Sequence, residues 1–125
     1  MQTTVVGLSP RASMALAILA ALKQAGPAQH PAEIEIEDIS GLLFKLHQHS
    51  IDIGDVALRR VPGGFYSEDV ENFIGHYVAS GRAEQMSPVH FTHEGLDFLQ
   101  KIVDNERNSN PHAIEIATRV LAMNP

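Results

Sequence analysis

The stretch from Gly63 to Val103 constrains the fold of this chain more than any other part of the sequence. Ser67 is a favourable N-cap, and the residues after it place apolar side chains at the spacing of one helix face. This face comprises Val70, Phe73, Ile74, Tyr77 and Val78. Gly81 then favours a left-handed stop. The pattern predicts an amphipathic helix that begins after Ser67 and ends at Gly81.

An extended segment, Arg82–Thr92, follows this helix. Val89 and Phe91 alternate with a polar residue, and Ser87-Pro88 suits the tip of a two-stranded hairpin. Thr92 then caps another helix with an apolar face formed by Leu96, Leu99, Ile102 and Val103, with Phe98 nearby. This order of turn, helix, hairpin and helix resembles the second half of winged-helix domains. The resemblance implies a fold that usually reads DNA.

A wider stretch, Gly41–Val103, is similar to the small bacterial domains known as Panacea or SocA-like antitoxin domains. Their pattern joins a Leu-rich helix, a Gly-Pro-Phe-Ser-like turn that opens a helix, a hairpin, and a Thr-x-x-Gly helix start. The matching residues are Leu42, Leu43, Phe44 and Leu46, then Gly64-Phe65-Tyr66-Ser67, then Thr92, Glu94, Gly95, Phe98 and Leu99. Phe65 stands where that family usually has Pro. The resemblance implies a domain that binds partner proteins, typically to neutralise a toxin.

Two further helices are predicted at the ends of the chain, over residues 9–25 and 111–123. Ser9-Pro10 and Asn110-Pro111 each combine a capping residue with proline at the first helical position. The first of these helices is apolar on every side from Ala12 to Leu22, so it must be covered on all sides. We expect it to pack against the C-terminal helix and a second copy of the chain, as a homodimer; burial within one chain is the alternative.

The segments between these elements are less strongly patterned. Residues 26–31 contain two prolines and a glycine and are expected to form a loop. Alternation over 33–38 suits a short strand or a lead into the next helix, which is predicted from Asp38, with Asp38 or Ser40 as its cap, to about residue 50. Residues 51–61 read as a connector with a short helix or strand at 55–60. A polar break is expected over 106–110.

Composition limits the classes of function that are open to the chain. Its 125 residues suit one domain, and 15 acidic against 9 basic residues give a net charge of −6, which favours cationic partners over nucleic acid. The absence of Cys excludes disulfides and thiolate metal sites and fits a reducing cytoplasm. The apolar run at 12–22 is too short for a bilayer span, which needs about 20 residues.

The exposed face of the helix after Ser67 is the first candidate site. Glu68, Asp69 and Glu71 occupy its first turn, where the helix dipole favours negative charge, and Asn72 and His76 continue the same face. Helices that read DNA normally present Arg, Lys, Asn or Gln here. Carboxylates repel phosphate, so this face is predicted to bind a protein partner rather than DNA.

Three arginines form the alternative site, for nucleic acid. Arg59, Arg60 and Arg82 would lie near one edge if Arg82 opens the hairpin, and there they could contact phosphate. The other reading, which we favour, is ion pairing with the acidic residues Glu68, Asp69 or Glu71.

The only grouping that suggests a metal site is His90 and His93 with Glu94, which His47 and His49 could join in space. Zinc needs three or four convergent ligands, and two histidines at a strand-to-helix junction do not supply them. The sequence also has neither a Gly-x-Ser-x-Gly elbow nor a phosphate-binding glycine loop. We therefore expect no metal, no cofactor and no catalytic residues.

These observations predict a single, mainly α-helical domain over residues 1–125 with a small β-hairpin. It would have a winged-helix-like core at about 39–103 and additional N- and C-terminal helices. The expected function is that of a non-enzymatic, antitoxin-like regulatory or adaptor protein that acts through protein–protein binding in the cytoplasm. The alternative is a DNA-binding transcriptional regulator of the winged-helix type.

Overall fold

The fold is mainly helical, with short strands at its edges, in a computed structural model that describes residues 6–25, 34–86 and 88–123. The helices in these ranges are α1 (Pro10–Gln24), α2 (Ile36–Gln48), α3 (Glu68–Ala79), α4 (His93–Ser109) and α5 (Pro111–Ala122). The strands are β1 (Val6–Gly7), β2 (Ile51–Asp52), β3 (Arg59–Val61), β4 (Gly64–Tyr66), β5 (Ala83–Met86) and β6 (Val89–Phe91). The predicted fold class, mainly α with a small β-hairpin, is confirmed.

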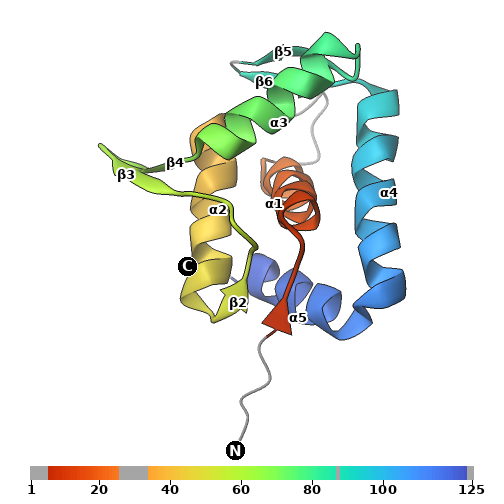
Figure 1. The fold of residues 1–125 in the computed structure, drawn as a ribbon. Coiled ribbons are helices and arrows are strands. Elements are labelled where there is room, and N and C mark those ends of the chain that lie inside the picture. Colours follow the sequence, from red (N-terminus) through yellow and green to blue (C-terminus); the bar gives the residue numbers. More distant parts are fainter. Residues whose placement is uncertain (1–5, 26–33, 87, 124–125) are drawn as a thin grey trace, which may run out of the picture.

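Helix α1 is the centre of the molecule. Figure 1 shows it end-on, framed by α2, α3, α4 and α5, and its side chains from Ala12 to Ile18 are all buried. Its many alanines leave room for α2 and α4 to approach closely. A single chain therefore buries most of this apolar helix, which is the alternative that the sequence left open, and leaves Leu19, Ala20 and Leu22 half-buried. No second copy is needed for that purpose, and the homodimer stays a prediction.

The predicted helix starts at Ser9, Ser67 and Thr92 are confirmed. Each side-chain oxygen accepts a hydrogen bond from a backbone N–H three residues later, at 3.2, 3.3 and 3.1 Å respectively. The stop at Gly81 is also confirmed, because Gly81 follows α3 with φ of +78°, a left-handed conformation that favours glycine.

The start of α2 differs from the sequence prediction. Residues 34–38 form no strand, because Ile34 makes only an isolated bridge to Val89 and the helix already begins at Ile36. The N-cap is Glu35, rather than Asp38 or Ser40. Asp38 lies three positions into the helix, and its carboxylate accepts the Glu35 backbone N–H at 2.9 Å, so it supports an earlier start. The predicted loop at 26–31 lies outside the described residues.

The break between helices predicted over 106–110 was wrong in its length, because only Asn110 lies outside a helix there. Helix α4 continues to Ser109, supported in its last turns by an ion pair of 2.8 Å between Arg107 and Asp104. Asn110 alone separates α4 from α5, and its side chain does not cap α5. Its Nδ2 donates instead to the carbonyl of Gly7 at 2.6 Å, which ties β1 to this corner.

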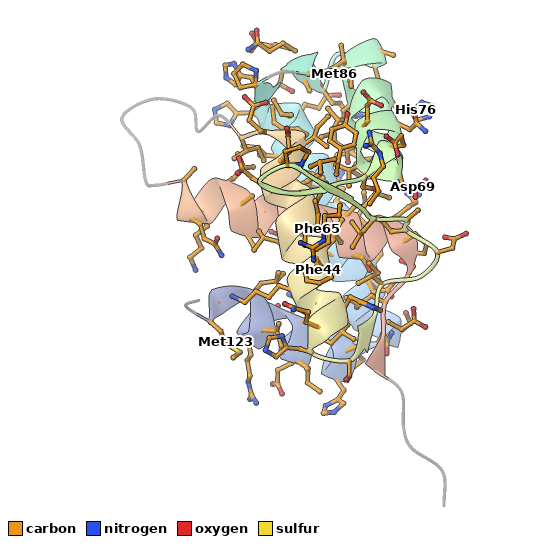
Figure 2. The ribbon with its side chains drawn as sticks, turned by 90° about the vertical axis from the view of Figure 1, so that its left-hand side faces the viewer. Phe44, Phe65, Asp69, His76, Met86 and Met123 are labelled. Atoms are coloured by element: carbon orange, nitrogen blue, oxygen red, sulfur yellow. The ribbon has the colours of Figure 1, made fainter. Side chains whose placement is uncertain are left out.

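The connector over 51–61 contains strands that the sequence only partly predicted. Strand β2 pairs in parallel with β1, and β3 pairs with β4 across the turn at Pro62-Gly63 to form a hairpin that we had not expected. Phe65 on this hairpin stacks on Phe44 of α2 with ring centroids 3.8 Å apart (Figure 2). The stack fixes the β3–β4 hairpin against α2.

The predicted hairpin β5–β6 is present and joins α4 at a tight backbone contact. The Thr92 backbone N–H and hydroxyl both donate to the carbonyl of Arg82, each at 3.0 Å. Gly95 is pressed against the same carbonyl, since a Cβ at this position would lie 2.0 Å from the oxygen. The Thr-x-x-Gly pattern therefore combines a helix cap with space for the neighbouring backbone.

Candidate partner-binding groove

The first turn of α3 is acidic, as predicted, but Glu68 is engaged within the chain. Its carboxylate accepts hydrogen bonds from Arg59 Nε at 3.0 Å and Nη2 at 2.8 Å, and both side chains are exposed. This hydrogen bond with the guanidinium lowers the pKa of Glu68 and raises that of Arg59. Glu68 thus neutralises a cation on the β3–β4 hairpin.

Glu71 lies on the side of α3 that faces the β3–β4 hairpin. Burial, followed by the nearby Glu71 carboxylate, raises the pKa of the Tyr66 hydroxyl to about 12. Glu71 is therefore part of the contact between α3 and the hairpin, and it does not line the groove described next.

The other three predicted residues of α3 share one groove. Asp69, Asn72 and His76 lie on consecutive turns, and Figure 2 shows Asp69 and His76 along the same edge of the helix. The groove has a volume of about 300 Å³ between α3, the start of α1 and the segment after β2. Its remaining lining residues are Pro10, Arg11, Met14, Asp55, Val56 and Phe73.

The wall of the groove after β2 is held at both ends. Gly54, with φ of +79°, packs so closely on α1 that a Cβ there would lie 2.5 Å from Pro10 Cγ. Three residues later, the Ala57 backbone N–H donates to Asp69 Oδ2 at 2.7 Å. Asp69 therefore has two roles. It fixes this wall through its hydrogen bond to Ala57, and it contributes a negative charge to the lining of the groove.

The three arginines of the alternative site do not form one cluster of available cations. Each guanidinium lies over an aromatic ring: Arg59 over Tyr66 at 5.1 Å, Arg60 over Phe65 at 5.0 Å and Arg82 over Phe98 at 3.9 Å. The expected pairing with an α3 carboxylate is confirmed for Arg59. It was wrong for Arg82, whose Nε lies 3.9 Å from Glu94 instead, and Arg60 stacks on Phe65 without a described ion pair to α3.

The histidines are spread over several elements. His90 is half-buried in β6, His93 is exposed at the start of α4, and His47 and His49 are exposed at the end of α2. Within the described ranges, no three His, Asp or Glu side chains lie close enough together to hold a metal ion. Over the same ranges, no helix is both long and apolar enough to cross a membrane.

Comparison of the chain with protein-family models, curated proteins and solved structures found no match. The resemblance to winged-helix and antitoxin domains therefore stays a prediction from the sequence, and function has to be argued from the groove itself.

Sequence reasoning missed the α1 and 54–57 sides of the groove. Asp69, Asn72 and His76 could be found because they share a helix face, whereas Pro10 and Gly54 are far apart in the sequence. The one available signal was Gly54, which interrupts the apolar residues Ile53 and Val56. A glycine inside such a run often marks a close approach of backbone.

Proposed function

We propose that this chain is a non-enzymatic regulatory or adaptor protein that binds another protein through the groove beside α3. The observation that supports this proposal is the combination of an apolar floor with a polar rim that includes Asp69, Asn72 and His76. Such a combination is typical of protein-recognition sites, in which apolar anchors provide affinity and polar groups fix orientation. An antitoxin-like role in the cytoplasm, where the partner would be a toxin, fits this activity.

The charges on this face argue against the alternative, a DNA-binding regulator. Non-specific affinity for DNA comes largely from phosphates that Lys and Arg neutralise. The guanidinium of Arg59 is paired with Glu68, and that of Arg82 is half-buried over Phe98 with Glu94 nearby. Both side chains are therefore less available to contact phosphate. The groove face of α3 places Asp69 where a DNA-reading helix would carry a base-reading or cationic side chain.

Retention on DNA as a function of salt concentration separates the two functions. We expect the protein to show little retention even at low salt and no preference for one sequence. A sequence-specific shift with a steep salt dependence, weakened by Arg60→Glu or Arg82→Glu, would overturn the protein-binding proposal. Lys101→Glu, which makes the same change of charge at an exposed position of α4, serves as the control for a general charge effect.

A further inference from the structure

The floor of the groove is built to receive an apolar group. Met14 and Val56 are only 7% and 9% exposed, and Phe73 and Pro10 are half-buried beside them. A volume of about 300 Å³ is at the small end of the range for ligand sites. It suits one or two large side chains of a partner better than an extended cofactor.

The wall of the groove after β2 is already formed in the unbound chain. The close packing of Gly54 on Pro10 and the hydrogen bond from Ala57 to Asp69 hold the segment between them. The Gly54 backbone N–H also donates to Asp52 Oδ1 at 2.8 Å, which secures the turn that leads into this segment. Because these contacts already exist in the unbound chain, less conformational entropy is lost on binding.

The rim of the groove is polarised. Asp55 and Asp69 stand on the side formed by α3 and the segment after β2, whereas Arg11 stands on the first turn of α1. Asp69 uses Oδ2 for Ala57, and no described protein group donates to its Oδ1. A cation on the occupant would therefore be attracted to the Asp55–Asp69 side and repelled from Arg11, and the net charge of −6 would favour its approach.

We infer that the groove binds a segment of the partner protein in which one large apolar side chain is flanked by a lysine or arginine. The inference rests on the proposed function and specifies the chemistry of its site. The apolar side chain fills the space over Met14, Val56 and Phe73, and the cation pairs with Asp55 and Asp69. Carboxylates at this position exclude phosphate, so the occupant is a peptide segment and not nucleic acid.

Selection from a random linear peptide library displayed on phage tests this inference with the whole chain as bait. Selected peptides would then be synthesised and their affinities measured for the wild type and four variants. Asn72→Arg extends a long cationic side chain from an exposed position at the groove, and Asp55→Lys reverses a rim charge. The matched controls, Asn105→Arg and Asp97→Lys, make the same changes at exposed positions of α4.

We expect the selected peptides to share an apolar residue close to a lysine or arginine. Asn72→Arg and Asp55→Lys should each weaken binding about tenfold or more, and both controls should leave it within about twofold. Circular dichroism and thermal melting of all four variants would show that they fold like the wild type.

Several outcomes would overturn the inference. These are a selection that yields no peptide, peptides that need no cation, and peptides that bind the wild type and Asn72→Arg equally well. A wild-type dimer in sedimentation that Asn72→Arg dissociates would assign the groove to a second copy instead. Acidic peptides that still depend on Asn72 would overturn the inference and leave protein binding in place, whereas specific DNA retention would overturn the proposed function.

Discussion

Among the described residues, Gly54 and Gly95 are the two glycines at which an added Cβ would lie closer than 3.0 Å to a neighbouring atom, and they join regions of different kinds. Gly95 lies at the buried joint between the β5–β6 hairpin and α4, where a Cβ would meet the Arg82 carbonyl oxygen. Gly54 is exposed in the wall of the groove, where a Cβ would meet Pro10. The first contact supports the scaffold and the second shapes the proposed binding site. Substitution of Gly95 should therefore mainly affect stability, whereas substitution of Gly54 should also affect binding.

The joint at Gly95 is the more sensitive of the two. An added Cβ would lie nearest to the carbonyl oxygen and carbon of Arg82, and this carbonyl already accepts hydrogen bonds from Thr92. Any shift would separate the hairpin from α4 and disturb the helix cap. At Gly54 the nearest atoms belong to the half-buried ring of Pro10 at the start of α1, so a shift of the wall there would leave the core in place.

The largest expected effect is that of Gly95→Ala on stability. Alanine favours a helix over glycine by about 1 kcal/mol, but the clash with the Arg82 carbonyl should outweigh this and destabilise the fold by about 4 kcal/mol. Gly41→Ala is the matched control, since a Cβ there meets nothing within 4 Å and should stabilise α2 slightly. Chemical denaturation measures both. Equal stability of the Gly95→Ala and Gly41→Ala proteins would contradict the role given to this joint.

The Gly54→Ala variant should be less destabilised than Gly95→Ala but should lose binding. Its positive φ and its contact with Pro10 predict a loss of about 3 kcal/mol. Gly81→Ala is the control, because Gly81 has φ of +78° but open space around it, so we expect a loss of about 1 kcal/mol from the left-handed conformation alone. Denaturation should rank the two, and only Gly54→Ala should reduce the affinity of groove-binding peptides. Equal losses of stability would show that the Pro10 contact has little effect.

Removing the Thr92 cap should have a smaller effect at the same joint. Thr92→Ala loses the oxygen that accepts the Gly95 N–H and the hydroxyl that donates to Arg82, which should cost about 1 kcal/mol. Thr92→Ser retains both hydrogen bonds and should recover most of that loss in thermal denaturation. A serine variant as unstable as the alanine variant would show that the methyl group, and not the cap, matters here.

The smallest expected effect is that of the exposed pair between Arg59 and Glu68. Because the folded state lowers the pKa of Glu68, the pair stabilises the fold above the usual glutamate pKa of 4.5 and loses this effect as the pH falls below it. Glu68→Gln should therefore lower stability slightly at neutral pH and make it fall less steeply with acidification than in the wild type. The same substitution at exposed Glu84 is the control. Identical slopes for the wild type and Glu68→Gln would show that the pair does not form in solution.

The sequence predicted the parts of this fold that depend on local patterns. The caps at Ser9, Ser67 and Thr92 and the stop at Gly81 follow from the preferences of single residues for helix ends. The β5–β6 hairpin was also predicted, since Val89 and Phe91 alternate with a polar residue and Ser87-Pro88 suits a hairpin tip. The Thr-x-x-Gly pattern was also recognised in the sequence. The reason for its glycine, which is the close approach of the Arg82 carbonyl to Gly95, is visible only in the structure.

The parts that the sequence did not predict depend on contacts between distant residues. The pairing of β1 with β2 joins strands of two residues each, too short to leave a periodic pattern. The groove brings together Pro10 of α1, Asp69 of α3 and the segment after β2, which Gly54 packs against Pro10. The α3 half of the site could be predicted, because Asp69, Asn72 and His76 share one helix face. Its other half could not.

Quantitative affinity capture from the native cell tests most directly whether the groove beside α3 binds a protein. Tagged wild-type protein, Asn72→Arg and Asn105→Arg would be used as baits at equal concentration. The account predicts that the wild type and Asn105→Arg retain the same partner in similar amounts, and that Asn72→Arg loses it. Retention of the same partner in equal amounts by all three baits would contradict it.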